Sequence, residues 1–365
     1  MALQQLVSVM GDLHEVQVLT SGARGLPSFE MQGHVAIHRA SVLGRHSEAI
    51  ASMSSMFSFL PAGVWRGSAL LDKQHFNLIN TWFAIPSGPT GVMLSRKYKI
   101  PQVLTMIGGD VYDPSKWYSP HRSFLTRAIV RWVMGQSRWI TTWSTDVRDR
   151  AKELFPRPIE IDVLPAGINE PRYRPVDRLL LGMERDTFYC ITIARLIRRK
   201  RLELLLDRFA ELTDPKIKLL ILGDGPEKKK LQKRIEKLEL GKRVELLGAV
   251  WGEKKFQYLA NSDAYISLSS HEGFGLVFLE AMACGLPVLA PAVGGQRDFL
   301  LHGRTGLMLE ADGEDLAQRV NELLDRPEFT IEMRKFNRRH VQPYYTSNLV
   351  EVWIETFERY LKAMF

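Results

Sequence analysis

Two glutamates at a fixed spacing suggest a site that holds hydroxyl groups. Glu272 and Glu280 are separated by seven residues, with Glu272 in a predicted loop and Glu280 on the predicted helix that follows it. This spacing places one carboxylate before the helix and one on its face, so the pair could hold two separate hydroxyl-bearing groups. Each glutamate alone also has an ordinary explanation, as a helix cap or as part of a solvated helix face.

The loop between the glutamates predicts an anion site. Gly273 and Gly275 lie in this loop, and the string SLSSHEGFGLVFLEAMACGLPVLAP, residues 267–291, predicts a strand, the loop and then a helix from near Gly275. The first amides of a helix have no partner inside it and carry partial positive charge. The amides of Phe274, Gly275 and Leu276 could therefore bind a diphosphate.

Two cations follow another predicted strand in the second half. Arg195 and Lys200 lie in ARLIRRKRLELLLDRFAEL, directly after TFYCITI. Beside a helix N-terminus, they could neutralise a diphosphate and the charge that develops when it departs. A solvated basic patch is the alternative.

A turn in the first half carries further polar candidates. The string TMIGGDVYD, residues 105–113, follows a predicted strand and contains Gly108 and Asp110. Asp110 could orient a hydroxyl of a donor or acceptor, or it could cap the next turn.

The string from Glu272 to Val288 resembles the signature of family 4 of the retaining glycosyltransferases, in which EGFGL precedes EAMACGLPV. The resemblance covers nearly the whole chain. It implies the GT-B fold and transfer of a sugar from a nucleoside diphosphate donor, with UDP- or GDP-sugars as the expected substrates. It also implies that no cofactor is needed, and that cations and the helix dipole replace a metal ion.

The same resemblance assigns roles on the donor side. It implies that Glu280 holds the ribose hydroxyls, that Glu272 holds a hydroxyl of the transferred sugar, and that Arg195 and Lys200 clamp the pyrophosphate. Ala194 stands where the family more often has glycine, and Arg201 stands where glycine is common.

Three further segments resemble the family pattern. The turn GDGP contains Gly223 and Gly225, which allow tight backbone turns close to the nucleotide. The segment VELLGAV resembles the one that reads the donor base, which makes Leu247 and its neighbours weaker candidates. Ile107 stands where the family usually has histidine, and this weakens the assignment of a general base, although a backbone carbonyl can take that role.

The elements that must position these residues alternate between short strands and amphipathic helices. This alternation predicts two doubly wound, Rossmann-like α/β domains that face each other across a cleft. We expect an acceptor-side domain over residues 1–170 and a donor-binding domain over residues 171–345, with the helix at 346–365 packing back on the first domain. Five strands are expected before residue 170 and six after it. Ligands should lie at the carboxyl ends of these strands.

The resemblance fails at the start of the chain. The string LQQLVSVMGDLHEVQVL begins at what resembles the first helix of the family, so we expect the first strand of the N-terminal domain to be absent from this sequence. Loss of an inner strand would leave unpaired backbone on both neighbouring strands. We therefore expect a segment upstream of this sequence, with a remodelled acceptor domain as the alternative.

Composition excludes several protein classes. The 365 residues are 45% hydrophobic and 25% charged, and only Cys190 and Cys284 occur, too few for a disulfide framework. The N-terminus does not resemble a secretory signal, and no apolar run is long enough to cross a membrane, so we expect a cytoplasmic protein.

The net charge is +8, and residues 51–150 carry twelve Lys/Arg against five Asp/Glu. An anionic partner is expected on the acceptor side, but basic and aromatic residues are not arranged as in nucleic-acid-binding modules.

One predicted helix could contact a membrane. In residues 121–138, Leu125, Ile129, Trp132 and Val133 cluster on one side and three arginines lie opposite. We expect the apolar side of this helix to face the core. The arginines would then give the protein surface a weak attraction to an anionic membrane.

Two other functions are considered. The absent first strand and Ile107 are compatible with a paralogue that binds nucleotide sugars without turnover. A phosphorylase or a nucleotide-sugar epimerase is disfavoured, because no setting for a pyridoxal-bearing lysine is found and an epimerase is not expected to carry EGFGL. The acceptor is not identified.

Overall fold

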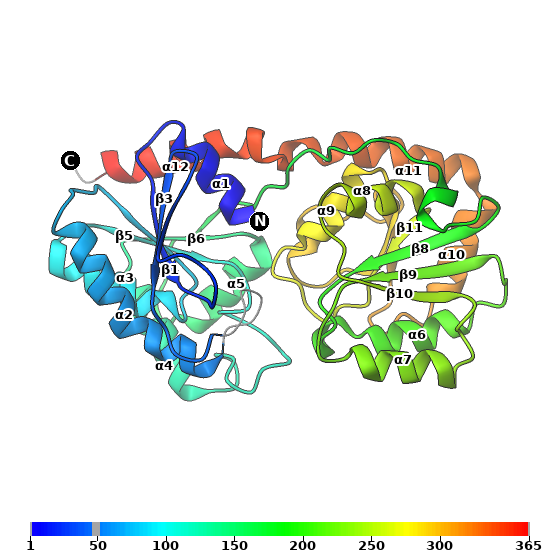
Figure 1. Ribbon diagram of the computed structural model, residues 1–365, viewed down its shortest axis with the longest axis horizontal. Helices are drawn as coiled ribbons and strands as arrows, with labels where there is room; N and C mark the ends of the chain where they lie inside the picture. Colours follow the sequence, from blue (N-terminus) through cyan, green and yellow to red (C-terminus); the bar gives the residue numbers. More distant parts are fainter. Residues whose placement is uncertain (1, 46–51, 364–365) are drawn as a thin grey trace. The chain divides into compact units, whose positions relative to one another are not determined.

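The computed structural model describes residues 2–45 and 52–363, which form two compact units (Figure 1). The first unit comprises the chain up to Gly167 together with the C-terminal segment from Thr346. The second unit runs from Ile168 to Tyr345. The division thus falls at Gly167 rather than at residue 170.

The first unit contains seven strands and six helices among its described residues. In chain order these are α1 (Ala2–Gly11), β1 (Gln17–Ser21), β2 (Phe29–Gln32), β3 (Val35–Ala40), α2 (Met53–Leu71), β4 (Ile79–Trp82), α3 (Ser87–Tyr98), β5 (Gln102–Met106), α4 (Phe124–Gln136), β6 (Trp139–Thr142), α5 (Thr145–Leu154), β7 (Asp162–Val163) and α12 (Thr346–Lys362).

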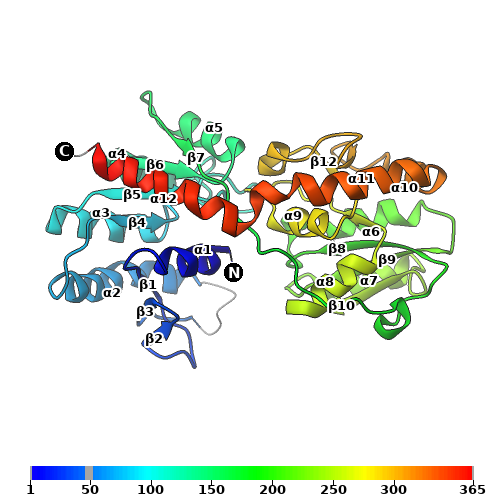
Figure 2. The same cartoon turned by 90° about the horizontal axis from the view of Figure 1, so that it is seen from above.

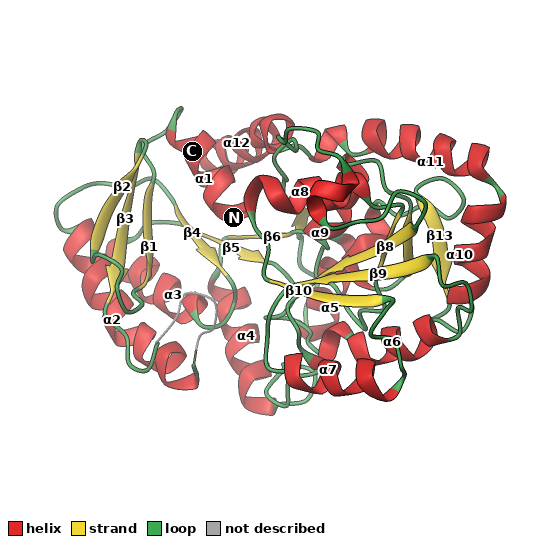
Figure 3. Ribbon diagram, turned by 45° about the vertical axis from the view of Figure 1, so that its right-hand side comes forward, coloured by secondary structure: helices red, strands yellow, loops and turns green. Residues whose placement is uncertain are grey.

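These strands form two separate sheets (Figure 3). One has the order β1-β3-β2 and the other the order β4-β5-β6-β7, in which all neighbours are parallel. No hydrogen-bonded strand joins β1 to β4 within the described residues. The strands of the first unit thus form no continuous sheet across the described residues.

The prediction of five strands in this half was wrong, because β2 and β3 were missed. They form an antiparallel hairpin in which Phe29 pairs with His38 and Gln32 with Val35. Gly33 makes the turn with φ of 60°. The exposed positions of β2 carry its apolar side chains and the half-buried positions its polar ones, so FEMQ did not resemble a strand in a buried parallel sheet.

The C-terminal helix α12 packs within the first unit, beside α1 (Figure 2). Its buried residues recur at helical spacing, and Trp353 stacks on Trp82 with ring centroids 5.5 Å apart. The indole N–H of Trp353 donates to the carbonyl oxygen of Pro165 at 3.0 Å. Burial of this apolar stripe therefore ties the end of the chain to the N-terminal sheet.

The second unit is a six-stranded parallel sheet with helices around it (Figure 1). Its strands are β8 (Phe188–Ile193), β9 (Ile217–Leu222), β10 (Val244–Gly248), β11 (Ala264–Ile266), β12 (Val288–Pro291) and β13 (Gly306–Leu309). Its α-helices are α6 (Leu202–Ala210), α7 (Lys228–Lys237), α8 (Gly252–Asn261), α9 (Leu276–Ala283), α10 (Leu316–Asp325) and α11 (Pro327–His340). Four 3-10 turns, η1 (Arg178–Leu181), η2 (Arg198–Lys200), η3 (Gly294–Asp298) and η4 (Gln342–Tyr344), complete it.

The strand order β10-β9-β8-β11-β12-β13 places β8 beside β11. The loop after β8 carries the predicted cations, and the loop after β11 carries the first glutamate. Because both strands are parallel, their carboxyl ends lie at the same edge of the sheet. The topology therefore brings two segments together that are far apart in the sequence.

Candidate functional site

Lys200 and Glu272 form a largely buried ion pair in the second unit. The Nζ of Lys200, at the end of η2, donates to Oε1 of Glu272 in the loop after β11. Desolvation raises the pKa of Glu272, but the charge and hydrogen bond of Lys200, together with Arg199 and Ser269, outweigh it, and the pKa lies below its usual value. The pair thus keeps a charged carboxylate beside an ammonium group at the sheet edge.

The backbone of Glu272 is clamped by η3, which the sequence analysis did not identify. The amide of Gly295 donates to the carbonyl oxygen of Glu272 at 2.8 Å. Gly294 has φ of 69°, and a Cβ atom built there would lie 2.3 Å from that same oxygen. Only glycine allows this approach, so η3 fixes the position of the carboxylate.

Helix α9 begins beside Glu272, as predicted. Gly275 precedes it with φ of 97°, and Leu276 is its first residue. Phe274 is buried and packs edge-on against Phe299, with ring centroids 5.5 Å apart. This packing anchors the loop, while the first amides of the helix have no acceptor inside it. Such a terminus suits an anion.

Glu280 also has a buried lysine partner, and this partner was missed by the sequence analysis. The Nζ of Lys255 on α8 lies 2.6 Å from Oε1 of Glu280. Lys255 is only 6% exposed, on the same helix face as buried Tyr258 and Leu259. The sequence did contain a signal for this pair, because Lys255 stands at a position where the helical spacing predicts an apolar residue. Glu280 therefore does not lie on an ordinary solvated helix face.

Arg195 lies directly after β8 and is exposed. Among the described residues, its guanidinium has no hydrogen-bond or ion-pair partner. An arginine at the carboxyl end of a central strand is well placed to meet an anionic ligand, because its charge is not already neutralised by the protein.

The glycines of the GDGP turn serve the protein's own packing. Gly223 and Gly225 have φ of 143° and 158°, and Cβ atoms there would lie 1.8 Å from the carbonyl oxygen of Ala194 and 2.5 Å from that of Leu196. The turn therefore fits closely against the loop that carries Arg195. Leu247 lies at the end of β10, where the register with β9 shifts.

Asp110 lies in the first unit, after β5, and both of its carboxylate oxygens accept backbone hydrogen bonds. Oδ2 accepts from the amide of Ala84 at 2.8 Å, and Oδ1 accepts from those of Gly108 at 3.1 Å and Ile107 at 3.3 Å. Asp110 is 6% exposed, and burial raises the pKa of its carboxyl group. Of the two roles left open by the sequence, this geometry favours organising the turn.

We expect Asp110→Ala to lower the free energy of unfolding by about 1–3 kcal/mol, because three backbone amides, two of them buried, lose their acceptor. The pKa of Asp110 is raised in the folded state, so its contribution is fully present below the ordinary aspartate pKa and declines as the pH rises through the raised value. Urea unfolding at acidic and neutral pH measures this.

Asp149→Ala is the matched control, since Asp149 is an exposed partner of Arg148 in the same unit. The free energy of unfolding of this variant should change by less than about 1 kcal/mol. Equal stability of the Asp110 and Asp149 variants would show that the buried hydrogen bonds of Asp110 do not hold the turn.

The helix α4 exposes more apolar surface than expected from a helix whose apolar side faces the core. Val133 is fully buried, but Leu125 is 66% and Trp132 39% exposed. Arg127 donates to the carbonyl oxygens of Pro120 and His121, each at 2.8 Å, instead of lying freely in solvent. The core-facing interpretation holds for only part of the apolar side, and contact with a membrane stays a prediction.

Over residues 2–45 and 52–363, no helix is both long and apolar enough to cross a membrane. Within the same residues, no group of three or more His, Cys, Asp or Glu side chains could hold a metal ion.

Two family models match the chain. Glycosyltransferase family 4 matches residues 3–172, and glycosyl transferases group 1 matches residues 181–340. The chain is 27% identical to an N-acetyl-alpha-D-glucosaminyl L-malate synthase from Bacillus anthracis over 94% of this chain and 88% of that protein. It is 28% identical to a D-inositol 3-phosphate glycosyltransferase from Pseudarthrobacter chlorophenolicus over 74% and 68% of the two chains.

Solved structures share the fold at lower identity. A sucrose-phosphate synthase from Thermosynechococcus elongatus matches with a TM-score of 0.87 and 22% identity, over 100% of this chain and 93% of the other. HepE from Anabaena, solved with UDP and glucose, matches with a TM-score of 0.77 and 18% identity over 95% and 100%. The chain therefore has the GT-B fold with two Rossmann-like domains.

Proposed function

The chain belongs to glycosyltransferase family 4, and we propose that it transfers a hexosyl sugar from a UDP- or GDP-sugar to a glycan, lipid or small-molecule acceptor with retention of configuration. One observation carries the proposal. The second unit gathers two buried lysine–glutamate pairs, Lys200 with Glu272 and Lys255 with Glu280, around the start of α9.

The donor diphosphate would bind at the amides of Phe274, Gly275 and Leu276, where the helix terminus favours negative charge. Arg195 and Lys200 would stabilise the charge that grows on the diphosphate as its bond to the sugar breaks. These groups can supply the positive charge without a metal ion, which makes the proposed reaction metal-independent.

The two glutamates would hold opposite parts of the donor. Glu280 would accept hydrogen bonds from the ribose hydroxyls, and Lys255 would keep its carboxylate charged and in place. Glu272 would accept from a hydroxyl of the transferred sugar. With the donor held at both ends, attack by the acceptor on the face that the diphosphate leaves would retain the configuration.

The structural neighbours support a nucleotide-sugar donor. HepE from Anabaena has been solved with UDP, with UDP and glucose, and with UDP-glucose. Two relatives are named for L-malate and for D-inositol 3-phosphate, both of which are anions. A UDP-sugar is therefore the first donor to test.

Thermal-shift measurements with UDP-, GDP- and ADP-sugars test the donor, followed by NMR of the anomeric proton after incubation with water or an acceptor mixture. We expect one nucleotide class to raise the melting temperature and its sugar to be released or transferred as the retained anomer. Inversion, or absence of binding by all three classes, would contradict the proposal. Binding without release of sugar would support the paralogue without turnover.

A further inference from the structure

Helices α2, α3 and α4 lie side by side in the first unit, on one side of its parallel sheet (Figure 1). Leu104 of β5 lies in one buried cluster with Val92 of α3 and Val130 of α4, whereas Val103 lies in another with Trp353 of α12. Because neighbouring residues of a strand point to opposite faces, α12 covers the other side of the sheet. The outer faces of α2, α3 and α4 therefore lie on the same side of the unit.

Helix α2 carries large apolar side chains on its outer face. Met53, Phe57, Pro61 and Trp65 recur at every fourth position and are exposed, Phe57 by 69% and Trp65 by 72%. The buried residues of this helix are Ser55, Phe59, Gly63 and Gly67. A surface helix ordinarily buries its apolar residues and exposes polar ones, so α2 has the reverse arrangement, with small residues at three of its four buried positions.

The two buried glycines let α2 lie close to α3. A Cβ atom at Gly67 would lie 2.5 Å from a methyl carbon of Leu94, and one at Gly63 would lie 3.0 Å from the methyl carbon of Thr90. The two helices thus leave no space between them for a large side chain. Packing within the described part of the unit explains the small residues of α2, but it does not explain the apolar residues on its outer face.

The apolar surface continues on the two neighbouring helices. Met93 of α3 is exposed, and so are Phe124, Leu125 and Trp132 of α4. Trp132 follows Phe124 by eight positions, with exposed Ala128 between them, so these side chains share one face of α4. A single exposed apolar residue is ordinary, but a set that extends over three adjacent helices is typical of a surface that contacts a protein or a membrane.

The same three helices carry positive charge and no negative charge. They contain no Asp or Glu, and their basic residues are Arg66, Arg96, Lys97, Arg127 and Arg131. None of these forms an ion pair within residues 2–45 and 52–363, and the two exposed ones have neutral partners. Arg96 donates to the side-chain oxygen of Gln136 on α4, and Lys97 donates to the hydroxyl of Ser68 on α2 at 3.1 Å.

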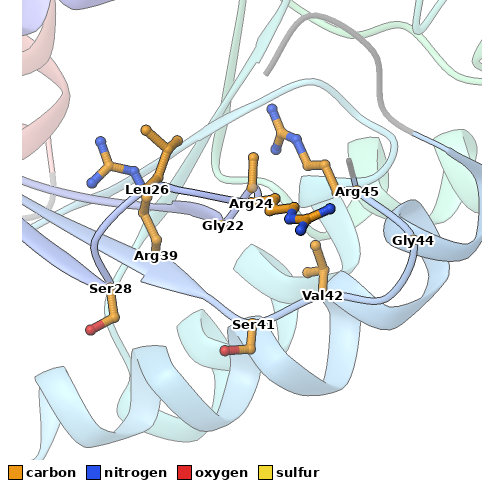
Figure 4. Close-up of a pocket in the computed structure, with 10 residues that line it drawn as sticks. Gly22, Arg24, Leu26, Ser28, Arg39, Ser41, Val42, Gly44 and Arg45 are labelled. Carbon is orange, nitrogen blue, oxygen red and sulfur yellow. The ribbon is translucent and has the colours of Figure 1, made fainter. Parts of the chain in front are cut away.

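Other arginines of the first unit are paired with carboxylates. Arg39, which Figure 4 shows in a pocket beside the loops that follow β1 and β3, donates to Glu30 at 2.7 Å. On α5, the helix that follows α4 in the chain, Arg150 pairs with Asp146 at 2.9 Å. Positive charge without a carboxylate partner is therefore a property of α2, α3 and α4 and is not shared by every helix of the unit.

We infer that the outer faces of these three helices dock on a lipid bilayer that contains anionic headgroups. This three-helix surface consists of Met53, Phe57, Pro61, Trp65, Met93, Phe124, Leu125 and Trp132, with Arg96 and Lys97 beside them. Its aromatic and aliphatic side chains would enter the interfacial layer, where Trp is favoured, and its cations would attract the headgroups. The inference goes beyond the proposed reaction and does not depend on it.

A second copy of the chain is a less suitable partner for the three-helix surface. A two-fold interface brings the same patch of both protomers together, so Arg96 and Lys97 would face their own copies. No carboxylate on α2, α3 or α4 would offset this repulsion. An anionic bilayer, in contrast, complements both the charge and the apolar side chains.

Co-sedimentation of the full chain with vesicles tests the inference. We expect binding to vesicles of phosphatidylglycerol mixed with phosphatidylcholine, weaker binding at high salt, and little binding to phosphatidylcholine alone. The double variant Phe57→Ser/Trp65→Ser should bind the anionic vesicles roughly tenfold or more weakly, because two apolar anchors are lost. Val352→Ser is the control, since Val352 is an exposed apolar residue of α12, on the other side of the sheet.

A second pair of variants tests the charge. Arg96→Gln/Lys97→Gln should weaken binding to the anionic vesicles roughly tenfold or more, because each cation near a charged membrane contributes on the order of fivefold in affinity. Lys233→Gln/Lys237→Gln removes the same net charge from exposed positions of α7 in the second unit. This matched control should bind like the wild-type chain. The urea midpoints of all variants should stay close to that of the wild type, because the changed side chains are exposed.

The possible outcomes distinguish the three-helix surface from its alternatives. Equal binding to neutral and anionic vesicles, or equal binding by the wild type and both three-helix variants, overturns the inference. A dimer seen by analytical ultracentrifugation that Phe57→Ser/Trp65→Ser dissociates, without vesicle binding, assigns the surface to a second copy and also overturns it.

These outcomes are separate from those of the proposed function. The thermal shift with UDP should be unchanged in every three-helix variant, because the proposed donor residues lie in the second unit. If vesicle binding depends on Phe57 and Trp65 but no donor is turned over, the proposed reaction fails while the docking surface stands. If a donor is turned over but no vesicles bind, the docking surface fails while the reaction stands.

Discussion

Replacing Lys200 with methionine is expected to lower the rate of sugar release or transfer by roughly tenfold or more. The change removes the cation proposed to meet the diphosphate and leaves Glu272, 7% exposed, without its ion-pair partner. Removal of one partner of a buried pair costs about 3–5 kcal/mol of stability. Steady-state rates and urea unfolding measure the two effects separately.

The pH dependence gives this prediction a sharper form. In the wild-type protein, Lys200 lowers the pKa of Glu272 against the effect of burial. The stabilising charge of Glu272 is therefore present above its ordinary pKa and is lost only as the pH falls through the lowered value. Without Lys200, the effect of burial on Glu272 is opposed less strongly, so the pKa of Glu272 should rise. The acidic limb of the pH–rate profile should therefore move to higher pH.

Two further variants complete this test. Lys230→Met breaks an exposed ion pair in which the side chains of Lys230 and Glu203 are 57% and 36% exposed. It should lower the free energy of unfolding by less than about 1 kcal/mol. Lys255→Met breaks the second buried pair and should raise KM for the donor, because it frees the carboxylate proposed to hold the ribose. If Lys200→Met behaves like Lys230→Met in both rate and stability, Lys200 has no role in the site.

Gly294→Ala is expected to have the second large effect, on activity and stability together. The added Cβ would lie 2.3 Å from the carbonyl oxygen and 2.9 Å from the amide nitrogen of Glu272. Both are backbone atoms, so the loop that carries the carboxylate must shift. A displacement on the order of 1 Å in a site that depends on positioning can lower the rate roughly a hundredfold.

Gly303→Ala is the matched control for this change. Gly303 has φ of 75°, close to the 69° of Gly294, but a Cβ atom there meets nothing within 4 Å. Both variants carry the conformational cost of a left-handed alanine, about 1–2 kcal/mol, and only Gly294→Ala adds the clash. Comparable rates in the two variants would show that the contact between Gly294 and Glu272 does not position the carboxylate.

Much of the fold could be predicted because its signals are local. The six strands of the second unit and the start of α9 follow from apolar runs, glycines and helix punctuation in short windows of sequence. The hairpin of β2 and β3 was missed because β2 is short and carries its apolar side chains at its exposed positions, although β3 has three buried residues. Burial of one face, which shows only in three dimensions, is what makes it a sheet.

The candidate site, like the fold, could be predicted from the sequence only in part. The glutamates, the helix terminus and the two cations were identified from residue types and spacing, as were Gly223 and Gly225. The structure adds a packing reason for the two glycines, because their neighbours are backbone atoms of Ala194 and Leu196. Close approaches between separate loops leave no periodic pattern in the sequence.

The sequence by itself determined which chemistry is present: two carboxylates, two cations and a helix start at the ends of parallel strands. Only the tertiary structure decided which groups meet. Lys200 reaches Glu272 across 72 positions of sequence because β8 lies beside β11, and Lys255 reaches Glu280 because the buried face of α8 meets α9. Periodicity specifies the face of each element, whereas strand order and helix packing arise from burial of all the elements at once.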